Sequence, residues 1–446
     1  MTEVTVGIDI GTTSVKALAV DGDGEVLARA RVPHDVYSPT SDAFEHKPDT
    51  AWRANVLKAF SRVSERHTVK GVNVAAMVPS LCAVDAKGKA LTPGLLYGDR
   101  RGGEVSGANP SDSGELVNFL AWCAAEAPNA AGFWPAQAVA NHALTGVGGI
   151  DTVTAMTTLP LFDFTGWDEA VAEEAGATTK QLPKIVSGSD AIGITTVASG
   201  HAGATVGGGT IDAFAEQLVS GAAHDGDVLV ICGTTLVLWA VIPEWREVEG
   251  LWTVPHTEPG KTLIGGASNA GGLFLGWANS LLPEDDEPLS SSQAIPVWEP
   301  YVRGERTPLH DPDRRAAVHF LDRTMGPNAV RRGAYEASGF ALRHHLDLAG
   351  VEAKRLVVTG GGAHVAGWVQ ALADATNTPA DVVAVPEGGA YGAAYLARVT
   401  AGLESDASGA RRWAKIDRRI EPDPAWSAAM HDRYAQYRVF ADGSGH

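Results

Sequence analysis

Two segments of the chain, half its length apart, combine residue types that bind phosphate. Residues 4–20 read VTVGIDIGTTSVKALAV, and residues 228–242 read VLVICGTTLVLWAVI. In both, an apolar strand leads through Gly-Thr-Thr into a second apolar strand. Glycine frees the backbone, and the threonines offer N–H and hydroxyl donors that suit phosphate oxygens. One copy is equally compatible with a plain tight turn, but two copies favour phosphate binding by Gly11, Thr12 and Thr13 and by Gly233, Thr234 and Thr235.

Asp9 distinguishes the first copy from the second. It precedes Gly11 by two residues and therefore lies on the same face of its strand, where the second copy has Ile231. An aspartate in an apolar strand is costly unless something compensates its charge. A Mg²⁺ ion carried by a nucleotide, held directly or through water, would do so. A structural hydrogen-bonding role for Asp9 is the alternative.

A second candidate carboxylate follows a glycine run. Residues 206–221 read VGGGTIDAFAEQLVSG, so Asp212 opens an apolar helix directly after three glycines. Aspartate is a favoured helix cap, and capping is one interpretation of this residue. Beside a glycine-rich loop and two phosphate turns, the same carboxylate is equally placed as a general base. In that role it would take the proton of an alcohol that attacks a γ-phosphate.

Further glycines near the C-terminus predict a nucleotide site. Residues 356–376 read LVVTGGGAHVAGWVQALADAT: a buried strand, a glycine run, and an amphipathic helix whose N-terminus suits an anion. The run is not a dinucleotide fingerprint, because no glycine stands three residues beyond Gly362. A second glycine turn at 386–390 opens a small-residue helix, which we expect to pack under an adenosine.

Two features that look functional are predicted to be structural. Gly260-Lys261-Thr262 resembles the end of a P-loop, but Pro255 stands where that motif needs a glycine. The 14 histidines show no metal-ligand spacing, and His344-His345 is predicted to lie on a solvated helix face.

The elements that must position these residues alternate between strands and helices. We expect strands at 25–32 and 72–78, helices at 48–66 and 210–223, and a surface loop over the Gly- and Ser-rich residues 102–118. The repeated hairpin predicts two related α/β domains, with the boundary near 222–226. We therefore divide the chain into residues 1–222 and 223–446.

Composition narrows the function further. The chain has 446 residues and a formal charge of −18, which argues against a nucleic-acid partner. Cys82, Cys123 and Cys232 lie in apolar settings, which indicates buried free thiols in a reducing compartment. The sequence shows neither a cleavable leader nor a stretch that spans a bilayer, so we expect a cytoplasmic protein without a membrane partner.

Together these motifs resemble the FGGY carbohydrate kinases, most of all the xylulose kinase group. GIDIGTTSVKALAVD and VICGTTLVLW are similar to the family's two phosphate loops, and GGGTIDAFA to its catalytic segment. The long stretch from Tyr301 to Asp347, with its GERTP segment, follows the C-terminal signature. The resemblance implies two actin-like ATPase (ribonuclease H-like) domains around a central interdomain cleft, with ATP and Mg²⁺ as cofactors. It also implies a homodimer.

The same resemblance assigns residues. It makes Asp212 the catalytic base and Asp9 the metal partner. It gives the N-terminal domain the sugar site and the first phosphate loop, and the C-terminal domain the second phosphate loop and the adenosine site. The nucleotide-binding residues that match by position are Thr12, Thr13, Gly233, Thr234, Gly272, Gly276, Gly361 and Gly362.

The departures from the family fall in the sugar region. Residues 97–101, YGDRR, match the family's Trp-x-Asp-x-Arg with Tyr97 in place of tryptophan, which keeps Asp99 as a substrate residue. Met77, Val78 and Pro79 stand where the family has polar residues that grip sugar hydroxyls. Losing such contacts costs selectivity among sugars. We predict that Met77, Val78, Asp99 and Asp212 line the substrate site, but the sequence does not identify the sugar that accepts the phosphate.

Three functions remain. The first is a kinase that phosphorylates a hydroxyl of a ketose, polyol or related acid. The second is a degenerate, non-catalytic sensor of a sugar or nucleotide, which the apolar residues 77–79 favour and which Asp9 and Asp212 oppose. The third is an actin-like or chaperone-like ATPase with a conformational output, which the GERTP segment disfavours.

Overall fold

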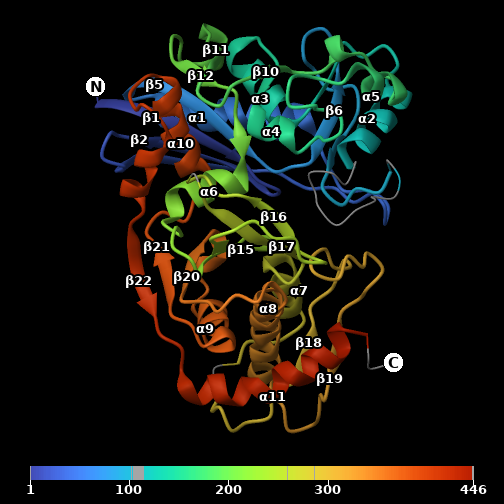
Figure 1. Cartoon of the computed structure of the whole chain (residues 1–446), viewed down its shortest axis with the longest axis vertical. Helices are drawn as coiled ribbons and strands as arrows, with labels where there is room; N and C mark the ends of the chain where they lie inside the picture. Colours follow the sequence, from blue (N-terminus) through green and yellow to red (C-terminus); the bar gives the residue numbers. More distant parts are fainter. Residues whose placement is uncertain (1, 102, 104–114, 259, 286, 444–446) are drawn as a thin grey trace. The chain divides into compact units, whose positions relative to one another are not determined.

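The computed structural model describes residues 2–101, 103, 115–258, 260–285 and 287–443, and the chain divides into two α/β units. The first unit contains the residues up to Val219 together with Glu387–Trp413, and the second contains Ser220–Pro386 and the residues from Ala414 onward (Figure 1). The predicted class of two α/β domains is confirmed. Relative to the predicted division at 222/223, the chief difference is the segment 387–413, which belongs with the first unit.

The main sheet of the first unit is built around β1, whose large apolar residues lie on one face while Thr5, Gly7 and Asp9 lie on the other. β1 pairs with β2 in antiparallel fashion and with β5 in parallel fashion. Two short strands from later in the chain pair in parallel with β5. The strands of this sheet are β1 (Thr2–Ile10), β2 (Ser14–Val20), β3 (Val26–Pro33), β5 (His67–Ala76), β11 (Ala191–Ile194), β12 (Thr205–Gly207) and β13 (Thr210–Ile211).

Helices cover both faces of this sheet. On the face with Val6 and Ile8 lies α1 (Asn55–Ser64), which follows a π-helical segment at Asp49–Ala54, and α3 (Ala136–Thr145) packs there too. The predicted helix at 48–66 is thus present in two parts.

On the opposite face lies α10 (Gly388–Thr400), which contacts β1 and β5 (Figure 1). A Cβ on Gly7 would lie 1.8 Å from the Ala390 carbonyl oxygen, so this close approach requires glycine. The expectation that the small residues of α10 pack under an adenosine is therefore corrected, because they pack against β1.

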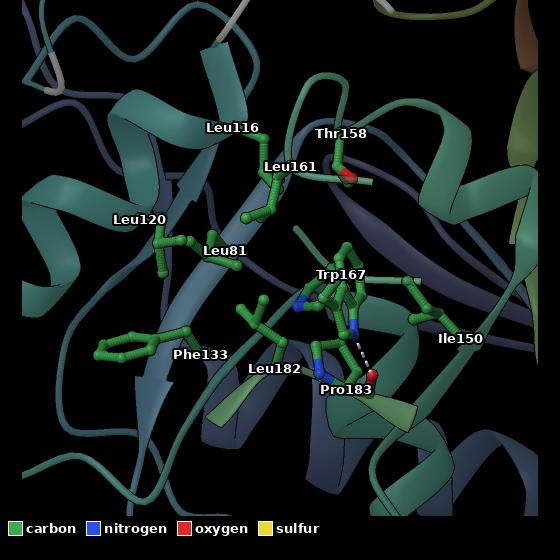
Figure 2. A pocket seen from close by; sticks show the side chains of 11 residues that line it. Leu81, Leu116, Leu120, Phe133, Ile150, Thr158, Leu161, Trp167, Leu182 and Pro183 are labelled. Carbon is green, nitrogen blue, oxygen red and sulfur yellow. Dashed lines mark hydrogen bonds between the residues drawn. The ribbon is translucent and has the colours of Figure 1, made fainter. Parts of the chain in front are cut away.

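A four-stranded sheet, a separate pair of strands and several helices complete the first unit. They enclose an apolar cluster around Leu81, Phe119 and Phe133, beside which Figure 2 shows a small pocket lined by side chains such as Leu161 and Trp167. None of the predicted site residues lines this pocket. The remaining elements are β4 (Glu45–His46), β6 (Ser80–Val84), β7 (Gly94–Leu96), β8 (Gly132–Trp134), β9 (Gly149–Asp151), β10 (Lys184–Val186), α2 (Glu115–Glu126), α4 (Thr152–Met156), α5 (Glu169–Glu174) and α6 (Asp212–Ser220).

Of the loop predicted at 102–118, residues 102 and 104–114 lie outside the described residues, and α2 occupies 115–118. The helix predicted at 210–223 begins later, at Asp212, because residues 210 and 211 form β13.

The second unit repeats the plan of the first. Its β14 pairs with β15 in antiparallel fashion and with β20 in parallel fashion, as β1 does with β2 and β5. The repeated Gly-Thr-Thr hairpin therefore marks the centre of each main sheet. The strands in sheet order are β16 (Trp252–Pro255), β17 (Thr262–Ser268), β15 (Leu236–Ile242), β14 (Asp227–Cys232), β20 (Arg355–Thr359), β21 (Ala380–Val383) and β22 (Ile416–Ile420), with β18 (Val297–Glu299) and β19 (Ala317–His319) forming a separate pair.

The α-helices of the second unit are α7 (Gly272–Ser280), α8 (Pro327–Ala349), α9 (Ala366–Thr376) and α11 (Pro424–Ala441), and a short 3₁₀-helix spans Gly361–His364. α8 starts at a proline and is ended by Gly350 in the left-handed conformation, as helix chemistry favours. The prediction of a solvated His344-His345 face is wrong, because both side chains are buried. His345 donates from Nδ1 to the Ala341 carbonyl and accepts at Nε2 from the Thr307 hydroxyl, at 2.7 and 2.8 Å.

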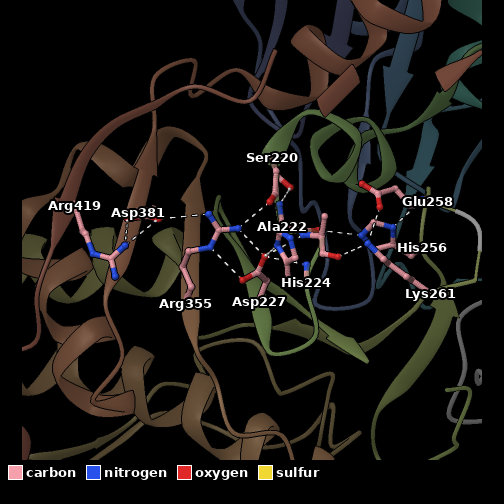
Figure 3. Close-up of polar contacts among 12 residues, drawn as sticks. Ser220, Ala222, His224, Asp227, His256, Glu258, Lys261, Arg355, Asp381 and Arg419 are labelled. Atoms are coloured by element: carbon pink, nitrogen blue, oxygen red, sulfur yellow. Dashed lines mark hydrogen bonds and ion pairs between the residues drawn. The ribbon is translucent and has the colours of Figure 1, made fainter. Parts of the chain in front are cut away.

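A ladder of alternating charges crosses the second sheet at the start of β14. Figure 3 shows Arg355 between Asp227 and Asp381, with Arg419 beyond Asp381. Arg355 also donates to the Gly221 carbonyl, which attaches the segment that enters the second unit to this sheet.

Lys261, from the segment that resembles the end of a P-loop, lies near the segment that enters the second unit and has a structural role. It donates to the Ala223 carbonyl and pairs with Glu258 (Figure 3). The three cysteines are buried free thiols, as predicted. Within the described ranges, no helix is long and apolar enough to cross a membrane.

Candidate active site

The first unit gathers its predicted site residues at one edge of its main sheet. Ile10 of β1 pairs with Ala76 of β5, and Ile211 of β13 pairs with the same alanine, all in parallel. Because the carboxyl ends of parallel strands meet at one edge, Gly11, Met77 and Asp212 emerge side by side. In open α/β sheets this edge is the usual place for ligands.

Asp212 owes its position to the glycine run before it. Gly209 has a φ of +103°, and a Cβ on Gly208 would lie 2.9 Å from the Asp151 backbone nitrogen, so both positions favour glycine. Side chains of α3 hold the same loop: Asn141 donates to the Gly208 carbonyl and Gln137 to the Thr210 carbonyl, at 2.9 and 3.2 Å. Asp212 then opens α6 half-buried, and its Oδ1 accepts from the N–H of the next residue at 2.7 Å.

Asp9 is buried in β1, as its apolar surroundings predicted, and has a partner that the sequence did not reveal. Lys16, its cross-strand neighbour on β2, lies 3.2 Å from Asp9 Oδ2. The same pairing raises the pKa of Lys16. Asp9 Oδ1 is buried and makes no hydrogen bond to any described residue. One oxygen of this carboxylate is therefore neutralised by lysine, while the other is left for a further partner.

Glu216 is a second buried carboxyl in this region and was missed from the sequence. It lies one helical turn after Asp212 on α6, and the pKa of its side chain is raised to about 8. Burial is the main cause, and the negative charges of Asp9 and Asp212 add to it, while Lys16 opposes the shift. The signal that could have identified Glu216 is its spacing of four residues from Asp212, which places both on one helix face.

The donor set around Asp9 fits a magnesium ion that is shared with a nucleotide. Among the residues with described coordinates, no group of three or more His, Cys, Asp or Glu side chains could hold a metal alone. Mg²⁺ commonly takes only one or two protein carboxylates and completes its shell with phosphates and water. The unpaired Oδ1 of Asp9 provides one such ligand position, directly or through water.

The loop from Gly11 to Thr13 closes the β1–β2 hairpin, with the Gly11 N–H bonded to the Ser14 carbonyl at 3.1 Å. Thr13 is exposed and Thr12 half-buried. The Thr12 carbonyl accepts a hydrogen bond from His46, and its hydroxyl lies 2.8 Å from the hydroxyl of Tyr97. The loop thus presents backbone and hydroxyl donors at the sheet edge, and its hydrogen bonds with His46 and Tyr97 hold it there.

The predicted substrate residues differ in how accessible their side chains are to a ligand. Met77 is buried in the core of the unit, whereas Val78 is half-buried beside it. Asp99 is buried, and its two oxygens accept from the N–H of Phe44 and from the backbone and guanidinium of Arg101. This geometry uses Asp99 to fix the turn at 97–101, so a direct contact with substrate remains only a prediction.

The second unit gathers its own set at the equivalent edge. β14 and β20 are parallel, with Ile231 opposite Thr359, so the Gly233 turn and the Gly360–Gly362 run follow adjacent strand ends. The N–H groups of Gly272 and Leu273, which begin α7, donate to the carbonyls of Gly233 and Thr234 at 2.9 Å each. Gly233, Thr234, Thr235 and Gly272 therefore form one bonded group, and Gly276 lies one turn further along α7.

Two adjacent glycines of this set serve different purposes. A Cβ on Gly362 would lie 2.1 Å from the ring of Trp368, so Gly362 is needed for packing. A Cβ on Gly361 would meet no described atom within 4 Å, so nothing in the fold of the second unit demands glycine there. Gly361 instead leaves an open backbone at the strand edge, where a ligand can approach closely.

Known proteins resemble the chain along nearly its whole length. The model of the FGGY family of carbohydrate kinases, N-terminal domain, matches residues 4–108, and the C-terminal model matches residues 228–401. The chain is 25% identical to xylulose kinase of Escherichia coli strain K12, over 97% of each chain. It is 24% identical to gluconokinase of Bacillus subtilis strain 168, over 87% of this chain and 85% of that one. The crystal structure of gluconate kinase from Lactobacillus acidophilus superposes with a TM-score of 0.81, at 20% identity, over 99% of this chain and 98% of that one, which shows a common fold.

Proposed function

The chain belongs to the FGGY family of carbohydrate kinases, and from this we propose that it transfers the γ-phosphate of ATP to a hydroxyl of a ketose- or polyol-type sugar. One observation carries the proposal. The phosphate turn at Gly11, the acceptor segment at Met77 and the carboxylate of Asp212 leave the same edge of three parallel strands. Such an edge can hold an alcohol, a phosphate and a base within reach of one another.

In this proposal Asp212 is the general base. It would accept the proton of the attacking hydroxyl as the oxygen bonds to the γ-phosphorus, and ADP would leave with the electrons of the broken P–O bond. The orienting bonds from Asn141 and Gln137 hold the segment that carries Asp212. Asparagine caps a helix as well as aspartate does, so Asp212→Asn tests the base while the helix start is kept.

The two Gly-Thr-Thr turns would hold phosphate oxygens through their N–H groups and hydroxyls. Asp9 would hold Mg²⁺, which when bound neutralises charge on the phosphates. Lys16 keeps the carboxylate of Asp9 in place, because the two groups pair across the strands at 3.2 Å. Gly361 would let the nucleotide approach the backbone of the second unit.

For the phosphoryl acceptor we propose a class of compounds rather than one sugar. The relatives named above act on xylulose and on gluconate, so ketoses, polyols and aldonic acids are all candidates. At 77–79 this chain offers apolar side chains to the acceptor, with Val78 the most accessible of the three. We also propose, from the family resemblance, that the protein works in the cytoplasm as a homodimer, which light scattering of the purified chain would test.

A non-catalytic sensor of the same fold is the alternative. Two observations favour it: Met77 is buried in the core, and the carboxylate of Asp99 is already bonded to Phe44 and Arg101. Both reduce the polar groups that could orient a sugar hydroxyl toward the phosphate. A sensor would bind nucleotide or sugar without turnover.

The deciding experiment is coupled ADP release with MgATP across ketoses, polyols and aldonic acids, for the wild type and Asp212→Asn. We expect one acceptor to raise turnover well above background, and Asp212→Asn to lower it by about 10²–10⁴-fold. The matched control is Asp168→Asn, which alters the aspartate cap of α5 and should leave turnover unchanged. Nucleotide binding without acceptor-dependent turnover would favour the sensor instead.

A further inference from the structure

Thr12 of the first phosphate turn is held by a chain of side-chain hydrogen bonds. The indole N–H of Trp52 donates to His46 Nδ1 at 3.0 Å, and because an indole can only donate, Nδ1 must be the acceptor. The proton of His46 therefore sits on Nε2, which donates to the Thr12 carbonyl at 2.8 Å. Burial lowers the pKa of His46 to about 4, so the neutral ring persists at physiological pH. The Thr12 backbone is thereby fixed.

The Thr12 hydroxyl has a partner from the acceptor side. Its Oγ1 lies 2.8 Å from Tyr97 Oη. The Tyr97 ring packs edge-on against Phe44, with 5.7 Å between ring centroids. The turn that carries Tyr97 is secured as well, because the Leu96 N–H donates to the Phe44 carbonyl and the Phe44 N–H donates to Asp99. The phenol is thus delivered by a rigid turn.

A bound phosphate would fix the direction of the hydrogen bond between the Thr12 and Tyr97 hydroxyls. A threonine hydroxyl has one O–H to donate and can accept as well, and a tyrosine hydroxyl is the same. A phosphate oxygen only accepts, so the Thr12 O–H must turn toward it. Thr12 Oγ1 then accepts from the Tyr97 O–H, and the two bonds in series strengthen each other.

We propose that Tyr97 is a positioning residue of the phosphate site, whose hydroxyl aims the Thr12 hydroxyl at a bound phosphate. This rests on the proposed kinase function. It gives Tyr97 a role in nucleotide binding, although its place in the turn at 97–101 suggests contact with the acceptor alone. The acceptor turn and the phosphate turn are thereby joined by one hydrogen bond.

The test measures binding of Mg²⁺ with AMP-PNP, a non-hydrolysable ATP analogue, by calorimetry without any acceptor. We expect Tyr97→Phe to raise Kd about three- to tenfold, the usual effect of one lost hydrogen bond. Thr12→Val should weaken binding at least as much, and the double variant no more than Thr12→Val alone, because both changes remove one coupled unit. Thr12→Ser, which keeps the hydroxyl, should restore binding. Tyr37→Phe is the matched control, since among the described residues its phenol donates to the exposed Asp35 side chain.

Four outcomes would overturn the proposal. A Tyr97→Phe variant that binds within twofold of the wild type removes the coupling while leaving the kinase function intact. An effect of Tyr97→Phe that multiplies with that of Thr12→Val does the same. A wild type that does not bind the analogue overturns this inference and the kinase function together. If Tyr97→Phe fails to fold, Thr12→Val against Thr12→Ser decides, and equal Kd values for these two overturn the proposal.

Discussion

Replacing Glu216 by glutamine tests whether a buried carboxyl between Asp9 and Asp212 holds a proton in the folded chain. The side chain lies against the N-terminal turn of α10, where a Cβ on Gly388 would meet its Cγ at 2.8 Å. One oxygen accepts from the Gly389 N–H, and Oε2 is buried without a partner among the described residues. Glutamine has nearly the same shape and no charge, so the substitution removes the ionisation and little else.

The magnitude follows from the difference between the folded and unfolded states. The pKa of Glu216 rises from an ordinary 4.5 to about 8 on folding. Between these values the folded state binds a proton that the unfolded state has lost, so the free energy of unfolding falls as pH rises, by about 1.4 kcal/mol per pH unit. Below pH 4.5 the contribution is at its full favourable value. At pH 7 the loss amounts to about 3 kcal/mol, an order-of-magnitude figure.

The assay is urea denaturation of the wild type and Glu216→Gln between pH 4.5 and 8, without nucleotide and with a chelator. We expect the variant to match the wild type near pH 4.5 and to exceed it increasingly toward pH 8, because only the wild type must keep Glu216 protonated. Glu126→Gln, an exposed residue at the end of α2, is the control and should show a difference that is constant with pH. A Glu216→Gln variant that differs from the wild type by the same amount at every pH would refute the reasoning.

The remaining predictions concern the other residues of the two sheet edges. Lys16→Met should lower the free energy of unfolding by about 2 kcal/mol in urea, because it leaves the buried carboxyl of Asp9 without its lysine partner. Asp9→Asn should cost less, since Lys16 is 27% exposed and can turn to water; equal losses would contradict this asymmetry. In the second unit, Gly362→Ala should lower the thermal midpoint by several degrees because of its clash with Trp368. Gly361→Ala should leave the midpoint unchanged but raise the Kd of Mg²⁺·AMP-PNP, and unchanged binding would argue against a nucleotide at this edge.

The repeated hairpin could be predicted from the sequence because neighbouring residues alone specify it in both copies. An apolar strand, a Gly-Thr-Thr turn and a second apolar strand specify an antiparallel pair without reference to distant residues, and the structure has one such pair at the centre of each main sheet. Asp9 was readable for a similar reason, since a charge inside an apolar strand has to be compensated. Its partner Lys16 was in principle within reach, because it faces Asp9 across a hairpin whose turn was identified.

Other features depend on contacts between distant segments and could not be derived in this way. The helix from Gly388 looked like a nucleotide helix because of its small residues, and only the structure shows that the smallness serves its approach to β1. His344 and His345 looked solvated because histidine pairs on helices commonly are. Their burial follows from the way α8 is enclosed by the second unit, with Thr307 as a partner 38 residues away.

Glu216 shows why a site can contain more than its motif. Glu216 and Asp212 lie on α6, whereas Asp9 lies on β1, far away in the sequence, and the start of α10, from a third segment, packs against Glu216. Apart from its spacing of four residues from Asp212, no local pattern marks this glutamate on an apolar helix as different from a solvated one. A protonated Glu216 would keep one negative charge away from the place where the proposed nucleotide phosphates bind, whereas an ionised one would add to the repulsion. The pH dependence of Glu216→Gln stability therefore bears on how this edge tolerates a polyanion beside three carboxyls and one lysine.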